Sequence, residues 1–95
     1  MSYGTIMIAK LKTPGSGQEL VDAGEKWKER AVPGYQGTWT LLGDDNETIV
    51  LCVSFESKES YMTLANDPAQ DEWWQTVVAP KIVGDPQWID GNWVM

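Results

Sequence analysis

The sequence predicts a single α+β domain in which two helices cover one face of an antiparallel sheet, in the order β-α-β-β-α-β. Three observations predict this class: four segments are rich in β-branched and aromatic residues, other segments are amphipathic at helical spacing, and turn residues separate them. The 95 residues suffice for one hydrophobic core, so the domain is predicted to occupy residues 1–95. A hydrophobic fraction of 42% and a charged fraction of 22% are typical of a globular protein.

The N-terminal third is predicted to hold a strand and a long helix. Apolar and β-branched residues dominate 3–12 and give way to a Thr-Pro-Gly turn, as expected for a strand. Ser16 and Glu19 are spaced as a capping box, in which the serine hydroxyl accepts a hydrogen bond from the amide of the third helical residue. Apolar residues then recur at helical spacing, which predicts a helix over 17–31 that is stopped by Pro33.

A hairpin and a divided helix are predicted next. Residues 35–42 and 48–55 are rich in aromatic and β-branched residues, and a Gly-Asp-Asp-Asn segment between them is typical of a turn. Ser57 is placed to cap one short helix, and Asp67 followed by Pro68 is placed to cap a second.

That second helix is predicted to end near Pro80, and a last strand is predicted over 87–94. Gln70 stands at the third helical position, where a glutamine completes a capping box. In the last strand, Asp90-Gly91 predicts a bend or bulge. The complete order is the split β-α-β, or ferredoxin-like, arrangement.

Composition excludes several classes of function. The net charge of −7, with Arg30 the one arginine, disfavours nucleic acid and membrane surfaces as partners, because both are bound mainly through Lys and Arg. The chain has no histidine and one cysteine, Cys52, so zinc sites of the Cys/His type, intramolecular disulfides and Ser-His or Cys-His nucleophile pairs are excluded. We expect no metal and no cofactor. No secretion signal is visible at the N-terminus, which predicts a cytoplasmic protein.

Both faces of the predicted strands are apolar. In the third strand, Val50 and Cys52 lie opposite an apolar set of Ile, Leu, Val and Phe, and in the first strand Ile6 and Ile8 lie opposite Met7 and its neighbours. Helices cover one face of such a sheet, and monomers rarely expose a contiguous apolar patch on the other. The sequence therefore predicts a homodimer that packs sheet against sheet.

Three stretches carry a resemblance to a known family. They are KLKTPGS, ERAVPGYQGTW and VSFESKESYMTLANDP. The chain resembles the antibiotic-biosynthesis-monooxygenase domain of the dimeric α/β-barrel superfamily over nearly its whole length. The matching motifs mark turns and helix starts, so they specify fold better than activity. The resemblance implies an apolar pocket between sheet and helices that binds a small aromatic or polycyclic phenol or quinol, and a monooxygenase activity without cofactor.

Two residues are the candidates for catalysis. Asn66 carries an amide that can donate to and accept from an oxygenated substrate, and it lies at the break before Pro68. Its alternative role is that of a turn residue. Tyr61 offers a phenol at the helix edge, and its alternative role is a packed aromatic with its hydroxyl in water.

Four aromatic residues are the candidates for substrate binding. Trp73 and Trp74 are adjacent and therefore about 100° apart on a helix, so we expect one to pack on the sheet and the other to face a ligand or a partner. Tyr35 and Trp39 are predicted to share one strand face, as substrate-binding or as core residues. In the last strand, Trp88 shares a face with Asp90 and is predicted to serve the core or the dimer contact, with ligand binding as the alternative role.

Two functions from different classes follow. The first is a cofactor-independent monooxygenase, in which a substrate that loses a proton passes an electron directly to O₂. The second is a non-catalytic dimer that binds a small apolar ligand or acts as an accessory subunit, favoured because no acid–base pair is evident. The haem-degrading branch of the family fits poorly, because its axial histidine on the second helix falls near Trp73 here and the chain has no histidine.

Overall fold

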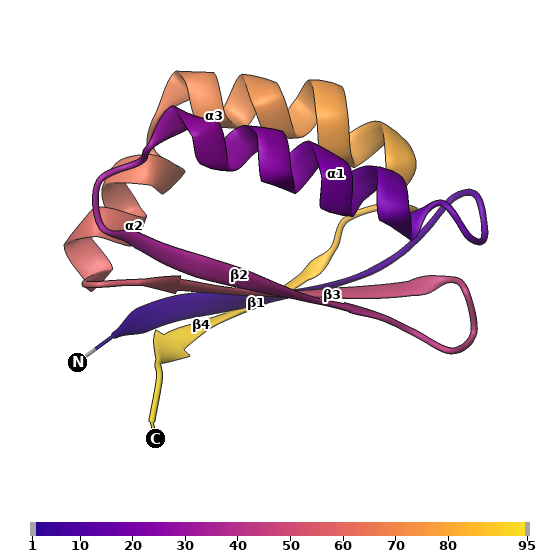
Figure 1. Cartoon of the computed structure of the whole chain (residues 1–95), viewed down its shortest axis with the longest axis horizontal. Coiled ribbons are helices and arrows are strands. Elements are labelled where there is room, and N and C mark those ends of the chain that lie inside the picture. The colour runs from indigo at the N-terminus through magenta and orange to yellow at the C-terminus, as the bar shows by residue number, and fades with distance from the viewer. Residues whose placement is uncertain (1, 95) are drawn as a thin grey trace.

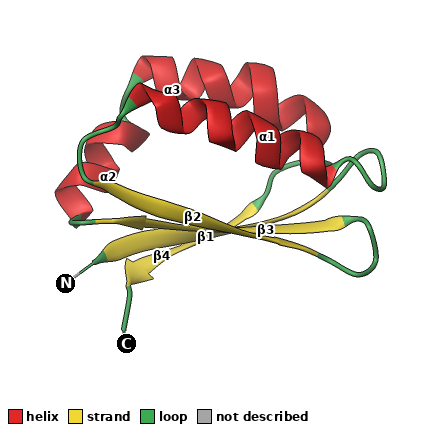
Figure 2. Cartoon of the chain, viewed as in Figure 1, coloured by secondary structure: helices red, strands yellow, loops and turns green. Residues whose placement is uncertain are grey.

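The protein is described by a computed structural model that covers residues 2–94. Its four strands form one antiparallel sheet in the order β2-β3-β1-β4 (Figures 1 and 2). The strands are β1 (Tyr3–Lys10), β2 (Tyr35–Leu42), β3 (Thr48–Phe55) and β4 (Gln87–Asn92). The predicted α+β class and the β-α-β-β-α-β order are confirmed, with strand ends within two residues of those predicted.

The helical segments cover one face of the sheet. In Figure 1, α1 and α3 lie side by side above the sheet, and α2 lies at the end where both chain termini are found. The segments are α1 (Gly17–Trp27), η1 (Lys28–Arg30), α2 (Lys58–Ala65), α3 (Pro68–Trp73), the π-helix η2 (Trp74–Val78) and η3 (Ala79–Lys81). The predicted division of the second helix is confirmed, and the helical chain after α3 continues past Pro80 by one residue.

Helix caps follow the predicted chemistry at two starts and depart from it at two positions. The Ser57 hydroxyl accepts a hydrogen bond from the Ser60 amide at 3.2 Å, and the Asp67 carboxylate accepts one from the Ala69 amide at 3.0 Å. The capping box at Ser16 is wrong, because its hydroxyl instead donates to the Thr13 carbonyl at 2.7 Å. The capping role of Gln70 is also wrong, since its side chain instead accepts a hydrogen bond from the Trp27 indole of α1.

The sheet carries a bulge at a place that the sequence did not indicate. The pairing of β2 with β3 shifts register between Tyr35 and Gly37, so Gln36 is the extra residue. Its side-chain oxygen accepts a hydrogen bond from the Ser54 hydroxyl at 2.7 Å. The bulge predicted at Asp90-Gly91 is absent, since β4 pairs with β1 in unbroken register over its whole length.

The hydrophobic core lies between the sheet and the helices. Fully buried side chains from β1 and β3 meet residues of α1 and of the segment after α3. The core residues are Met7, Ala9, Leu11, Leu20, Ile49, Val78 and Ile82. At roughly 1.5–3 kcal/mol for each large apolar side chain removed from water, this cluster is the main source of stability.

The opposite face of the sheet is apolar and uncovered. Trp39 and Leu41 on β2 are each 64% exposed, and Ile89 on β4 is 52% exposed. Between them, the register places Ile6 and Cys52 on the same side. This finding agrees with the predicted two-faced apolar sheet.

Candidate functional site

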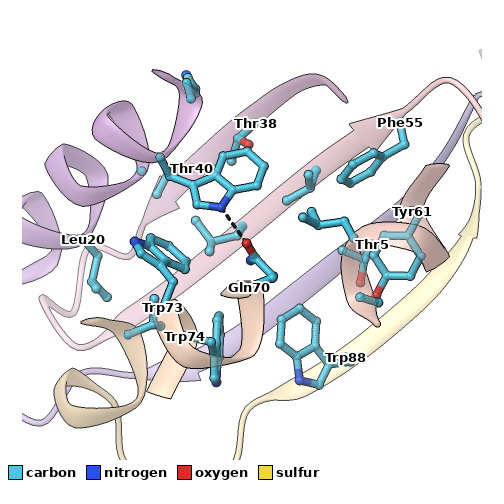
Figure 3. A pocket seen from close by; sticks show the side chains of 18 of the residues that line it. Thr5, Leu20, Thr38, Thr40, Phe55, Tyr61, Gln70, Trp73, Trp74 and Trp88 are labelled. Carbon is cyan, nitrogen blue, oxygen red and sulfur yellow. Dashed lines mark hydrogen bonds between the residues drawn. The ribbon is translucent and has the colours of Figure 1, made fainter. Parts of the chain in front are cut away.

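A cavity of about 550 Å³ lies between the sheet and the helical layer (Figure 3). Its walls are mainly apolar and aromatic, and they come from all four strands, from α1, α2 and α3, and from η1 and η2. The aromatic lining residues are Trp27, Phe55, Tyr61, Trp73, Trp74 and Trp88. This volume falls in the range of roughly 300–1,000 Å³ that is usual for small-molecule sites.

Both tryptophans of the Trp73-Trp74 pair border the cavity. They point in different directions, as their adjacent positions in the helix require. The Trp73 ring lies 6.3 Å from the Trp27 ring of α1, and the Trp74 ring lies 5.2 Å from the Trp88 ring of β4. The expectation that one of the pair packs on the sheet and the other faces a ligand or a partner is therefore modified, because the cavity is wide enough to be lined by both.

The backbone changes its winding next to this pair. The segment from Trp74 to Val78 is a π-helix, which has one more residue per hydrogen-bonded turn than an α-helix. Single turns of π-helix are found often at functional sites. Here the wider turn begins at a cavity-lining tryptophan and ends at Val78, which also lines the cavity.

Gln70 connects the two helices above the cavity. Its Oε1 accepts a hydrogen bond from the indole N–H of Trp27 at 2.7 Å and a longer one from Arg30 at 3.4 Å. Figure 3 shows the Gln70 side chain inside the cavity, with the dashed line marking the bond to the indole. The amide group expected at Asn66 is thus supplied to the cavity by a residue one helical turn later.

Asp90, Thr5 and Tyr61 form the polar end of the cavity. The Thr5 hydroxyl donates to Asp90 Oδ1 at 2.6 Å, and the Tyr61 hydroxyl donates to the same oxygen at 3.3 Å. Burial raises the pKa of the Tyr61 phenol, and the negative charge of Asp90 adds to the rise. Tyr61 therefore keeps its proton at neutral pH and acts as a hydrogen-bond donor.

Three of the predicted site residues lie outside the cavity lining. Asn66 is exposed at the end of α2. Tyr35 packs edge-on against Trp27 and Phe55, with ring centres 5.0 and 5.8 Å away. Trp39 lies on the opposite sheet face. The prediction that Tyr35 and Trp39 share a face is wrong, because the bulge at Gln36 reverses the alternation between them.

The sequence analysis did not identify Thr5 and Gln70 as site residues. It placed Asp90 on the same strand face as Trp88 but assigned it no function. Thr5 is buried, and a buried hydroxyl needs a partner that only the pairing of β1 with β4 provides. The shared face of Trp88 and Asp90 was predictable from strand alternation and is confirmed, since both line the cavity.

Within residues 2–94, no group of three His, Cys, Asp or Glu side chains is arranged to hold a metal ion. None of the helices in the same range has the length and apolar character that crossing a bilayer requires.

Solved structures share this fold over nearly the whole chain. A monooxygenase from the gene ActVA-Orf6 of Streptomyces coelicolor, in complex with the ligand nanaomycin D, superposes with a TM-score of 0.80 at 19% identity, covering 99% of this chain and 88% of that one. A protein named "putative antibiotic biosynthesis monooxygenase" from Nitrosomonas europaea gives a TM-score of 0.76 at 18% identity, covering 98% of this chain and 90% of that one.

A third structure has the same fold and is described by its assembly. It is a dimeric ferredoxin-like protein of unknown function from Jannaschia sp., with a TM-score of 0.70 at 13% identity, covering 95% of this chain and 97% of that one. No family model and no curated protein sequence matches the chain. The comparisons confirm at the level of fold the resemblance predicted from the sequence: this chain has the ferredoxin-like fold of proteins named antibiotic biosynthesis monooxygenases.

Proposed function

We propose that this protein is a cofactor-independent monooxygenase of the antibiotic-biosynthesis-monooxygenase family that acts on a small aromatic or polycyclic phenol or quinol. The observation that carries the proposal is the aromatic cavity of about 550 Å³ between sheet and helices. Four tryptophans line it, and flat aromatic ligands pack well against such rings. The shared fold with a monooxygenase that was solved with nanaomycin D bound supports the same class of ligand.

In the proposed reaction the substrate itself supplies the electrons that reduce O₂. An activated ring CH₂ loses a proton to give a carbanion that is delocalised over the aromatic system, and this carbanion transfers an electron to O₂. One oxygen atom then becomes a ring carbonyl and the other leaves as water, so that CH₂ and O₂ give C=O and H₂O. The protein contributes burial, orientation and hydrogen bonds to the developing enolate oxygen.

Each part of the cavity has a role in this proposal. Trp73, Trp74 and Trp88 hold the flat ring system, and the Tyr61 hydroxyl, whose proton goes to Asp90 Oδ1, accepts a hydrogen bond from a substrate hydroxyl. The raised pKa of Tyr61 keeps that proton on the phenol at neutral pH. Asn66, which is exposed outside the cavity, has no part in it.

A non-catalytic ligand-binding dimer is the second candidate. The absence of histidine favours it, because the chain lacks the side chain that most often serves as a general base. The same cavity would then bind an aromatic ligand without turnover.

We also propose that the chain is a homodimer that buries the uncovered sheet face. The exposed residues Trp39, Leu41 and Ile89 support this assembly. A fold neighbour that is itself described as dimeric supports it too. Sheet-to-sheet packing would convert an exposed apolar surface into an interface core.

Oxygen uptake with anthrone as substrate tests the activity. We expect consumption of one O₂ per anthrone oxidised and, with ¹⁸O₂, one labelled oxygen atom in the quinone product. Trp74→Ala should lower the rate at least tenfold, whereas Met62→Ala, an exposed change outside the cavity, should leave it unchanged. Tight binding of anthrone without any oxygen uptake would instead support the ligand-binding dimer.

A further inference from the structure

Asp90 presents one carboxylate oxygen that has no partner among residues 2–94. Both hydrogen bonds that it accepts, from Thr5 and Tyr61, go to Oδ1. Oδ2 accepts none from the described part of the chain. Because Asp90 lines the cavity, this second oxygen is an acceptor available to a ligand.

Gln70 presents the complementary group. Trp27 and Arg30 can only donate hydrogen bonds, so the atom of Gln70 that they share must be the carbonyl oxygen, and the amide orientation is fixed chemically. The amide nitrogen Nε2 therefore points elsewhere, and no acceptor within residues 2–94 takes its N–H groups. Gln70 also lines the cavity, so Nε2 is a donor available to a ligand.

We propose that Asp90 and Gln70 are the pair of residues that determines ligand specificity in this cavity. Asp90 Oδ2 accepts a hydrogen bond from a ligand hydroxyl, and Gln70 Nε2 donates one to a ligand carbonyl or enolate oxygen. Figure 3 shows Gln70 extending from the helical side and Thr5 beside Tyr61 at the other end, with aromatic side chains around them. The ligand class is a flat aromatic molecule with a free hydroxyl on one part and a carbonyl on another. This inference rests on the proposed function only in sharing its cavity.

Charge in the cavity further restricts the ligand to a neutral molecule. Three carboxylates line it, those of Glu25, Asp71 and Asp90, against one amine, that of Lys28. Lys28 already donates to Glu25 at 2.9 Å. A ligand carboxylate beside Asp90 would therefore find no unpaired cation among the lining residues, and like charges at short range repel. The pair selects a protonated hydroxyl and rejects an acid in the same position.

Two isosteric substitutions test the pair. Asp90→Asn retains an oxygen for Thr5 and Tyr61 but replaces Oδ2 with a donor. Gln70→Glu retains an oxygen for Trp27 but replaces Nε2 with an acceptor. Each change therefore preserves the internal hydrogen bonds and inverts the group offered to the ligand. The exposed residues Asp85 and Gln75, which do not line the cavity, provide the matched controls Asp85→Asn and Gln75→Glu.

Calorimetric titration under nitrogen at pH 6 with four probes measures the outcome. The probes are 6-hydroxy-1-tetralone, 1-tetralone, 2-naphthol and the 6-carboxylate of 1-tetralone. For the unmodified protein we expect the hydroxyketone to bind about tenfold tighter than 1-tetralone or 2-naphthol, as one good hydrogen bond provides. The carboxylate should bind more weakly than 1-tetralone.

The variants should remove these preferences separately. Asp90→Asn should abolish the advantage of the hydroxyketone over 1-tetralone, and Gln70→Glu should abolish its advantage over 2-naphthol, while both control variants keep both. Persistence of either preference in its variant, or tighter binding of the carboxylate than of the hydroxyketone, would overturn the assignment. Oxygen uptake is measured in a separate assay, so a lack of turnover beside intact selectivity would count against the monooxygenase and not against the pair.

Discussion

The indole N–H of Trp27 donates to Oε1 of Gln70 at 2.7 Å, and this bond joins α1 to α3 across the top of the cavity. The two residues are 43 positions apart in the sequence. Neither helix could hold this geometry alone, since each is shorter than the roughly 12–15 residues at which isolated helices become marginally stable. The bond therefore couples the helical layer that roofs the cavity into one unit.

Breaking the bond between Trp27 and Gln70 should destabilise the fold. Trp27→Phe and Gln70→Met each remove one partner of the bond. We expect each to lower the free energy of unfolding by about 1–3 kcal/mol, because the other partner is left without a hydrogen bond and, for Trp27→Phe, a cavity remains where the indole was. Urea unfolding of both single variants and the double variant gives a coupling energy, expected at about 1 kcal/mol. Strict additivity of the two changes would show that the bond contributes nothing.

Gly4 and Gly24 should respond to alanine in opposite directions. A Cβ atom at Gly4 would collide with the Val53 carbonyl and with the Trp93 indole, so Gly4→Ala should cost roughly 1–3 kcal/mol. Apart from its chain neighbours and the backbone of its own helix, no atom lies within 4 Å of a Cβ built on Gly24 in α1. Gly24→Ala should therefore stabilise the protein by about 0.5–1 kcal/mol through helix propensity. Thermal unfolding of the two variants provides the measurement, and equal effects of the same sign would contradict the expected contact at Gly4.

Asp45 should make the hairpin sensitive to acid. Its carboxylate accepts hydrogen bonds from the Thr48 hydroxyl and from the amides of Glu47 and Thr48, which hold its pKa well below the usual range. The stabilisation is present above the unfolded-state pKa, which is about 3.9, and is lost as the pH falls below it. Asp45→Ala should lower Tm at pH 7, and the difference from the unmodified protein should shrink below about pH 4. Asp44→Ala is the control, and a pH-independent difference for Asp45→Ala would contradict the role of its charge.

The uncovered sheet face should be the dimer contact. Introducing charge on this face, as in the double variant Trp39→Lys and Leu41→Lys on β2, should convert a dimer into a monomer, because unpaired charges are costly in an interface. Light scattering coupled to gel filtration measures the mass. Val83→Lys, at an apolar residue that is 57% exposed outside the sheet, should leave the mass unchanged. A monomeric unmodified protein, or a dimer that survives the double variant, would exclude this interface.

Strand and helix order could be predicted because local patterns determined it. Strand alternation, the turn before Thr48 and the cap at Asp67 depend on residues close in sequence. The predictions that failed, the Ser16 cap and the position of the bulge, depend on which of several possible hydrogen-bond partners a residue takes. Ser16 follows Gly15, whose φ is +83°, and in the tight turn so formed its hydroxyl donates to the Thr13 carbonyl and caps no helix amide. The bulge at Gln36 depends on pairing with β3, which the sequence of β2 does not contain.

The site was less predictable than the fold, for the same reason. Tyr61, Trp73 and Trp74 were predicted correctly because large aromatic side chains on a helix that packs on a sheet lie mostly between the two layers, and all three line the cavity. Gln70 looked like a capping residue and Thr5 like a strand residue, since their partners are 43 and 85 positions away. Long-range hydrogen bonds of this kind decide which polar atoms remain free.

The six tryptophans are divided by the sheet, and this division gives the protein two separate optical reporters. Trp27, Trp73, Trp74 and Trp88 border the cavity, whereas Trp39 and Trp93 lie with the opposite face. A quinone entering the cavity would quench the emission of the first four by close ring contact. Closure of a second subunit over the sheet would instead shift the emission of Trp39, which is 64% exposed, to shorter wavelength as water leaves. With phenylalanine at Trp39 and Trp93, the remaining signal would follow ligand occupancy alone.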